Sequence, residues 1–253
     1  MPTCLAISLV DQPIGCQTGI TPSTGISFVN KASFIPVLYN LLVKIIKGSK
    51  EQTFTAQEFE GLSSKFAYSV LDIGTGDGRF VYKMAKENHE KLFVGMDPSQ
   101  KQLEIYSKKI NKEKLENVLL VLGSVEIPPQ ELIGKFDEIY INFPWGSLLG
   151  GIATANTKIV ETICKFCKPY SQIEIIFGYS DEAEPTEYER LQLEKIDQEL
   201  IANKIVPEFS KFGFKLEHLE ELRKEVLVKI GSSWAKKLKF GQDRKMFRLA
   251  LVR

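Results

Sequence analysis

The sequence is poor in the residues that build metal and redox sites, with two histidines and four cysteines among 253 residues. His89 and His218 lie far apart in the chain, so the Cys164-x-x-Cys167 pair has no evident second pair of zinc ligands. A redox CxxC usually opens a helix after a strand, whereas this one lies late in an expected helix that Pro169 stops. We therefore expect no metal site and two partly buried thiols in a reducing compartment.

Long apolar runs and an excess of one charge are absent as well. The best candidate for a membrane span, residues 34–46, is too short and contains Pro36, Asn40 and Lys44. The N-terminus lacks the basic leader of a secretory signal, so we expect a cytoplasmic protein. The formal net charge of +1 identifies no partner.

The beginning of the chain differs in composition from the rest. Residues 1–33 have only Asp11 and Lys31 as charged side chains, are rich in Gly, Thr, Ser and Pro, and show no helical or strand period. We expect an N-terminal extension over residues 1–40, as loop or disordered chain, and a single domain over residues 41–253. A helical pattern at 181–207 predicts an inserted helix within that domain.

Expected strands and helices alternate from residue 54 onward. Such alternation indicates βαβ units, and hence an α/β, Rossmann-like fold with a mostly parallel seven-stranded sheet and helices on both faces. Thr53 or Thr55 would cap the first helix. The expected strands are 68–73, 91–96, 118–122, 138–143, 172–177, 214–222 and 244–252, and the expected helices are 54–65, 79–87, 99–111 and 156–168.

A glycine-rich turn follows the first buried strand, in Asp72-Ile-Gly-Thr-Gly-Asp-Gly78. Glycine permits a tight turn and the close approach of a ligand to the backbone. Asp97 ends the next strand, about 20 residues further on, where an acid suits the hydroxyls of a ribose. The spacing is GxGxG, followed by Arg79, and differs from the GxGxxG fingerprint of dinucleotide-binding proteins.

The turn resembles the first motif of class I methyltransferases, which bind S-adenosylmethionine (SAM). That resemblance implies that Asp97 lies at the ribose, and that Val125 and Glu126, after the third strand, lie beside the adenine. The residues implied to face the methionine end are Asp72, Gly74, Thr75, Gly76 and Gly78. A glycine turn without a ligand and an NAD-dependent enzyme are the alternatives.

The fourth strand ends in Asn142-Phe-Pro-Trp-Gly146, at the sheet edge where substrate contacts belong. The motif loosely resembles the Asn-Pro-Pro-aromatic signature of amino-group methyltransferases. Phe143 replaces the first proline of that signature, which weakens the case for methylation of an exocyclic amine. Trp145 is either a core residue or an exposed stacking surface.

Two groups of basic residues could bind a nucleic acid. Residues 226–253 have Asp243 as their only acid, and Trp234 lies within this basic segment. An aromatic among lysines can stack on a base while the cations hold phosphates, although a solvated loop is the alternative. The second group, Lys108, Lys109 and Lys112, follows the second helix, and helix surfaces are often lysine-rich.

Four stretches together resemble one family. They are Leu71-Asp-Ile-Gly-Thr-Gly-Asp-Gly-Arg79, Gly95-Met-Asp-Pro98, Phe143-Pro-Trp-Gly146, and Ser233-Trp-Ala-Lys-Lys-Leu238 with Phe240-Gly241. They are similar to aminoglycoside-resistance methyltransferases of the kanamycin–apramycin type, which modify N1 of adenine 1408 in the decoding site of 16S rRNA. The resemblance covers residues 44–253.

This resemblance implies a substrate and a role for several residues. Trp145 and Trp234 would sandwich a flipped adenine, with Ser147 and Ser232 bordering the cofactor and target pocket. The partner would be the 30S subunit at helix 44 of 16S rRNA, bound by a monomer, and S-adenosylhomocysteine would be the product. Contacts to rRNA would come from Lys108, Lys109, Lys112, Arg190, Lys236, Lys237 and Arg244. Two positions depart from the family, because Gln242 and Asp243 stand where relatives are often basic.

The expected chemistry is simple. A stacked base cannot reach the methyl group and must be flipped out. Neutral adenine N1 already holds a lone pair, so the attack needs no prior deprotonation. We expect catalysis by placement against two rigid tryptophan faces, with no side chain acting as an obligatory proton acceptor.

The sequence is also compatible with other functions. A tRNA guanine-N7 methyltransferase has a similar Pro/Trp-rich motif, but Ser147-Leu-Leu-Gly-Gly151 lacks the basic run that usually follows it. A small-molecule methyltransferase would not need the basic loop and should survive charge reversal at Lys236 and Lys237. A non-catalytic RNA-binding module would bind ribosomes and transfer no methyl group.

Overall fold

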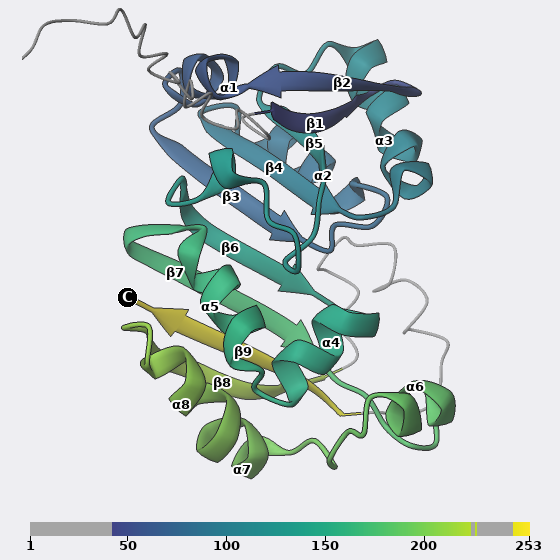
Figure 1. Cartoon of the computed structure of the whole chain (residues 1–253), viewed down its shortest axis with the longest axis vertical. Coiled ribbons are helices and arrows are strands. Elements are labelled where there is room, and N and C mark those ends of the chain that lie inside the picture. Colours follow the sequence, from purple (N-terminus) through teal and green to yellow (C-terminus); the bar gives the residue numbers. More distant parts are fainter. Residues whose placement is uncertain (1–41, 224–225, 227–244) are drawn as a thin grey trace, which may run out of the picture. The chain divides into compact units, whose positions relative to one another are not determined.

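A mostly parallel β-sheet runs through the computed structural model, which describes residues 42–223, 226 and 245–253 (Figure 1). The described residues form one sheet of nine strands in the order β2-β1-β5-β4-β3-β6-β7-β9-β8. The middle strands from β5 to β7 are parallel, and the two strands at each edge are antiparallel to their neighbours. The bounds are β1 Leu42–Lys47, β2 Lys50–Thr55, β3 Tyr68–Ile73, β4 Lys91–Asp97, β5 Val118–Leu122, β6 Phe136–Asn142, β7 Cys167–Phe177, β8 Lys215–Leu222 and β9 Met246–Val252.

Helices cover both faces of the sheet, which confirms the expected α/β fold class. On one face, α2 (Arg79–Glu87) and α3 (Gln100–Glu113) bury apolar side chains against β3, β4 and β5. On the other, α4 (Gly146–Ala153), α5 (Thr157–Lys165) and α8 (Val206–Ser210) pack on the second core (Figure 1). The strands between the two layers of helices have near-continuous apolar sequences because both of their faces are buried.

The expected count of seven strands is wrong, because the hairpin of β1 and β2 adds two strands at one edge. Gly48, with φ of +67°, lies in the tight turn of this hairpin. Val43 and Ile45 are buried while Lys44 between them is exposed, as in a strand with one covered face. This alternation is too short to stand out from the apolar segment that precedes it.

The first helix begins two residues later than expected, because β2 extends to Thr55. Phe54 and Thr55 belong to β2, and α1 (Ala56–Ser63) begins after them. The Thr55 hydroxyl accepts from the Glu58 N–H at 3.1 Å, and the Thr55 N–H donates to Glu58 Oε2 at 2.7 Å. This reciprocal pair is a capping box, so Thr55 rather than Thr53 is the cap.

The segment 181–207 forms several short helices rather than one inserted helix. They are α6 (Pro185–Arg190), α7 (Gln198–Leu200) and a π-helical turn, Ile201–Ile205, that continues into α8. Leu193 and Ile196 are buried as their helical spacing suggested, but they lie in the irregular chain between α6 and α7.

The Cys164-x-x-Cys167 pair spans the end of a helix and the start of a strand. Helix α5 ends at Lys165, three residues before the end expected from the sequence, and Cys167 opens β7. Both cysteines are buried and unbridged, and burial raises the pKa of Cys167 to about 11. Two inert core thiols fit these facts. Within the described ranges, no helix is long and apolar enough to cross a membrane.

Candidate active site

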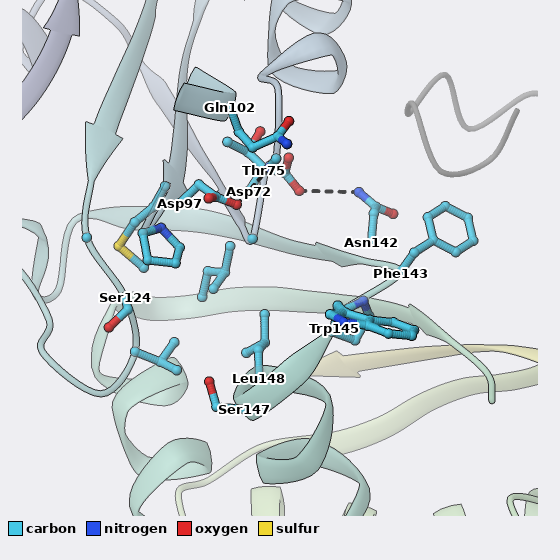
Figure 2. A pocket seen from close by; sticks show the side chains of 18 of the residues that line it. Asp72, Thr75, Asp97, Gln102, Ser124, Asn142, Phe143, Trp145, Ser147 and Leu148 are labelled. Carbon is cyan, nitrogen blue, oxygen red and sulfur yellow. Dashed lines mark hydrogen bonds between the residues drawn. The ribbon is translucent and has the colours of Figure 1, made fainter. Parts of the chain in front are cut away.

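A cavity of about 380 Å³ lies where the strands β3, β4, β5 and β6 end (Figure 2). Parallel strands bring their carboxyl ends to the same edge, which is where open α/β sheets bind ligands. The volume lies within the range of small-molecule sites. Of the residues assigned to cofactor and target from the sequence, those lining it are Asp72, Gly74, Thr75, Gly76, Asp97, Val125, Glu126, Trp145 and Ser147.

The glycine turn between β3 and α2 wraps one side of the cavity. The N–H groups of Gly74 and Thr75 both donate to the Met96 carbonyl, at 2.8 and 3.1 Å, and this ties the turn to β4. Gly76 has φ of +60°, and a Cβ built there meets nothing within 4 Å. The backbone at Gly76 is therefore open to a ligand.

Gly78 was expected to face the methionine end of SAM, but in the structure it lies at the start of α2. It does not line the cavity and instead caps α2 with φ of +79°. A Cβ at this position would lie 3.0 Å from Leu120 Cδ2 and 3.6 Å from Tyr106 Cβ. The third glycine of the turn thus lets the helix pack closely on β5 and α3.

Asp97 is fixed in place at the end of β4. Its Oδ2 accepts from the Gly76 N–H at 2.9 Å and its Oδ1 from the Ser99 N–H at 2.8 Å. Burial raises the pKa of Asp97, while these two backbone donors oppose the rise. Each carboxylate oxygen keeps a further lone pair, so the group can still accept from two hydroxyls.

The deepest part of the cavity is polar but incompletely hydrogen-bonded. Asp72 at the end of β3 is 2% exposed, and Asn142 Nδ2 at the end of β6 donates to its Oδ1 at 3.4 Å (Figure 2). Burial raises the pKa of Asp72 to about 7. Within the described part of the chain, Asn142 Oδ1 is buried without a hydrogen-bond partner, while hydrogen bonding from the Thr75 side chain opposes the rise in the pKa of Asp72. An unpaired buried polar atom beside an acid suits a polar, cationic ligand.

The wall of the cavity formed by the loop after β5 combines an apolar surface with an acid. Val125 is buried, and Glu126 follows it in the loop after β5. Burial acts to raise the pKa of Glu126, but hydrogen bonding from Ser147 and Ser124 outweighs it and leaves the pKa below its ordinary value. An apolar face beside an ionised acceptor can hold a flat base with an amino group.

The loop after β6 is strained and presents Trp145. Phe143 has φ of +55°, and its N–H donates to the Ile176 carbonyl at 2.7 Å. Trp145 lines the cavity and is 46% exposed, which excludes the alternative of a core tryptophan. Figure 2 shows it on the side of Asn142 and Phe143, across from Asp97 and Ser124.

Comparison with known proteins agrees with this geometry. Residues 44–252 match the family model NpmA, described as 16S rRNA (adenine(1408)-N(1))-methyltransferase. A protein from Escherichia coli named 16S rRNA (adenine(1408)-N(1))-methyltransferase is 33% identical over 81% of this chain and 96% of its own length. The chain belongs to this family. It is a SAM-dependent methyltransferase with the class I fold.

Solved structures give the same result for this methyltransferase. A variant of a 16S rRNA (adenine(1408)-N(1))-methyltransferase from Catenulisporales acidiphilia, with its cosubstrate SAM, is 26% identical with a TM-score of 0.75, over 83% of this chain and 96% of that one. The aminoglycoside resistance methyltransferase NpmB1 is 29% identical with a TM-score of 0.68, over 83% and 98% of the two chains. The family resemblance found in the sequence motifs is confirmed.

The expected RNA-binding residues that the structure describes lie on two helices of the methyltransferase, α3 and α6. Lys108, Lys109 and Lys112 are exposed on α3, and none of them lines the cavity. Arg190, at the end of α6, is exposed and forms an ion pair with Glu187 at 2.6 Å. The expected site residues that lie outside the described residues are Ser232, Trp234, Lys236, Lys237 and Arg244.

Several lining residues were not assigned from the sequence. Asn142 was recognised only as part of a motif, although its position at a strand end is the signal that marks Asp72 and Asp97. Gln102 reaches the cavity from the first turn of α3, and Ser124 from the loop after β5 (Figure 2). These two lack a motif and become visible only through the packing of the loops. Metal-ligand clusters are absent from the described ranges.

Proposed function

We propose that this methyltransferase transfers the methyl group of SAM to N1 of adenine 1408 in the 16S rRNA of the 30S subunit, and thereby protects the ribosome from aminoglycosides. The observation that carries the proposal is Trp145, an exposed stacking surface that shares one cavity with Asp72, Asp97 and the glycine turn. Family membership and the names of the relatives support the substrate.

The residues of the cavity fit the cofactor from end to end. Asp72 and the unpaired Asn142 Oδ1 would bind the charged methionine end, with Thr75 beside them in the cavity lining. Asp97 would accept from the ribose hydroxyls, because its carboxylate is held by two backbone donors and has lone pairs left. Val125 and Glu126 would pack on and accept from the adenine.

The role of the protein's own residues in the reaction is to position the adenine and the cofactor relative to one another. When bound, SAM supplies a methyl group on a sulfonium; the N1 lone pair forms the new bond as the carbon–sulfur bond breaks and its electrons stay on sulfur. Trp145 stacks on the flipped adenine and holds N1 in line, with Trp234 proposed on the other face of the base. Neutral adenine N1 carries no proton to lose, so no side chain has to accept one, and Asp72, Asp97 and Glu126 are free to serve in cofactor binding.

Docking on the subunit would use two groups of basic residues together with Arg190. Lys108, Lys109 and Lys112 on α3, Arg190 on α6, and Lys236, Lys237 and Arg244 of the basic segment are proposed to hold rRNA phosphates around helix 44. A monomer suits such a docking mode, and a ribosomal substrate places the enzyme in the cytoplasm. Residues 1–40 are proposed to be an extension outside the catalytic domain of 41–253.

The decisive experiment is transfer from labelled SAM to purified 30S subunits, with the modified base mapped by primer extension. We expect one stop at adenine 1408, which Trp145→Ala weakens strongly. Labelling of tRNA or of a small molecule, with none on 30S subunits, would leave the enzyme class standing and disprove the substrate. Charge reversal at Lys236 and Lys237 separates an RNA substrate from a small one, since only the RNA reaction should be lost.

A further inference from the structure

Two tyrosines and three cations gather between α2 and α3. The rings of Tyr82 and Tyr106 have centroids 5.1 Å apart and are tilted by 51°. Lys109 Nζ lies 4.6 Å from the Tyr82 centroid and 5.7 Å from that of Tyr106. Lys86 Nζ lies 5.4 Å from the Tyr82 centroid, and Arg79 Cζ lies 5.4 Å from the Tyr106 centroid. All three cations are within reach of a cation–π attraction.

The rings of Tyr82 and Tyr106, called here the tyrosine platform, are anchored through Glu113. Tyr82 is buried, and its hydroxyl donates to both carboxylate oxygens of Glu113, at 2.9 and 2.8 Å. Lys86 Nζ donates to Glu113 Oε2 at 3.1 Å. The hydrogen bond from Tyr82, and then that from Lys86, hold the pKa of Glu113 below its ordinary value, so the anchor is ionised at neutral pH. The platform is therefore ordered before any partner arrives.

Lys109 differs from its neighbours in what it contacts. Lys108 pairs with Glu104 at 3.7 Å, and Lys86 pairs with Glu113. Among the described residues, Lys109 forms no ion pair within 4 Å; the rings of Tyr82 and Tyr106 face its Nζ, and the charge of Lys109 also helps to lower the pKa of Glu113. A ring face attracts an ammonium group without neutralising it, so Lys109 can still bind a phosphate.

Ordering a lysine in advance favours the binding of a phosphate. A free lysine side chain loses much of its rotamer freedom when it meets a phosphate, and this loss opposes binding. A lysine whose ammonium is already held over two rings has lost part of that freedom in the unbound enzyme. Its contact with a phosphate then contributes more to affinity than that of an unrestrained lysine.

We propose that Tyr82 and Tyr106 are positioning residues that hold Lys109 over the tyrosine platform for one backbone phosphate of the rRNA. This inference rests on the proposed function and adds to it, because it assigns two uncharged residues to recognition of the 30S subunit. Tyr106 acts through Lys109 and touches neither the cofactor nor the target base.

The test is a double-mutant cycle on the full-length enzyme. Lys109→Gln should raise the KM for 30S subunits and lower the slope of log KM against log salt by about one, the value for one lost phosphate contact. Tyr106→Leu should raise the same KM about two- to fivefold, the range of an exposed cation–π contact. Tyr106→Phe keeps the ring, so its KM for 30S subunits should equal that of the wild type. In the Lys109→Gln background, Tyr106→Leu should have no further effect.

The chain offers a matched control. Lys91 Nζ lies 4.4 Å over the ring of Tyr68, at the edge of the sheet opposite to the cavity, and Lys91→Gln should leave the KM for 30S subunits unchanged. The dissociation constant of SAM should stay the same in every variant.

The two proposals fail in different ways. If Tyr106→Leu raises the KM equally with and without Lys109, or weakens SAM binding to the same degree, the residue is merely structural and the inference is wrong. If Tyr106→Leu leaves the KM unchanged, the inference is also wrong while the proposed function stands. A wild-type enzyme that does not methylate 30S subunits at all would disprove the function, and this inference with it.

Discussion

Asn142 Nδ2 donates to Asp72 Oδ1 at 3.4 Å and so joins the ends of β6 and β3, two neighbouring parallel strands. The bond fixes the one fully buried carboxyl group of the cavity, and it leaves Asn142 Oδ1 without a partner. The pair therefore presents an acceptor and a titratable acid at the same point. We expect Asn142 Oδ1 and the Asp72 carboxyl group to complete their hydrogen bonding with the charged end of SAM.

The affinity for SAM should rise with pH through about 7, the pKa to which burial raises Asp72. A cationic ligand prefers the carboxylate to the neutral acid, so deprotonation strengthens binding. Asp72→Asn should bind SAM more weakly above pH 7 and show no such rise. At saturating SAM its kcat should stay within a few-fold of wild type, because neutral adenine N1 needs no base. Calorimetric titrations from pH 6 to 8 and single-turnover rates check both points; a collapse of kcat with SAM still bound would make Asp72 a proton acceptor.

Asp72 should also give the free energy of unfolding a definite pH dependence in the absence of ligand. Its pKa is about 7 in the native state and 3.8 when unfolded, so the native state binds more protons between these values. The stability should therefore fall as the pH rises from 3.8 to about 7, and Asp72→Asn should remove this contribution. Urea unfolding of both proteins at pH 5 and 7 measures the difference. An equal change of stability with pH in the two proteins would contradict the buried acid.

Gly76→Ala and Gly78→Ala should separate ligand binding from folding. Both glycines have positive φ, so alanine at either position costs about 1–2 kcal/mol of backbone strain. At Gly76 the new methyl meets no protein atom but stands at the cavity wall, and the affinity for SAM should fall in addition. At Gly78 it approaches Leu120 at 3.0 Å, and stability should fall further with a smaller effect on SAM. Unfolding midpoints and SAM titrations of the two variants test this; the reverse pattern would place Gly78 at the ligand.

Trp145→Ala should lower kcat/KM for 30S subunits by roughly 5- to 150-fold, which corresponds to the 1–3 kcal/mol of one stacked base. Trp145→Phe retains a ring and should lose less. Because Trp145 is 46% exposed, the free energy of unfolding should change by about 1 kcal/mol or less. Methylation rates over a range of subunit concentrations, beside thermal unfolding, distinguish the two effects. An alanine variant that lost stability and SAM binding but kept its rate on 30S subunits would make Trp145 a packing residue.

The cofactor half of the site could be predicted because the sheet is buried on both faces. Strands of this kind stand out as apolar runs, and the polar residues at their ends, Asp72 and Asp97, stand out in turn. The glycine turn between them is a local motif that needs no tertiary information. The same logic applied to the end of β6 would have added Asn142, whose partner lies 70 residues away in the chain.

The helix α4 could not be predicted, because its sequence argues against it. Gly150 and Gly151 lower the helix propensity of a segment of eight residues. Tertiary packing reverses this preference: a Cβ at Gly151 would lie 2.7 Å from Ile159, and one at Gly150 would lie 3.0 Å from Leu191. The glycines are required by neighbours that the sequence alone does not identify. The helix positions Ser147, so this part of the cavity was placed only by resemblance.

Phe143→Pro should unfold the loop that presents Trp145, although it would restore the proline of the amino-group methyltransferase signature. Phe143 has φ of +55°, whereas proline is fixed near −65°. Its N–H also donates to the Ile176 carbonyl at 2.7 Å, and proline has no such donor. We expect a loss of about 3 kcal/mol or more in the free energy of unfolding, together with loss of methylation. Phe143→Leu keeps the donor and the apolar contacts with Ile176, Leu222 and Met246, and should cost about 1 kcal/mol. Urea denaturation of the two variants makes the comparison, and a proline variant as stable as the leucine variant would show that the loop does not need its left-handed residue.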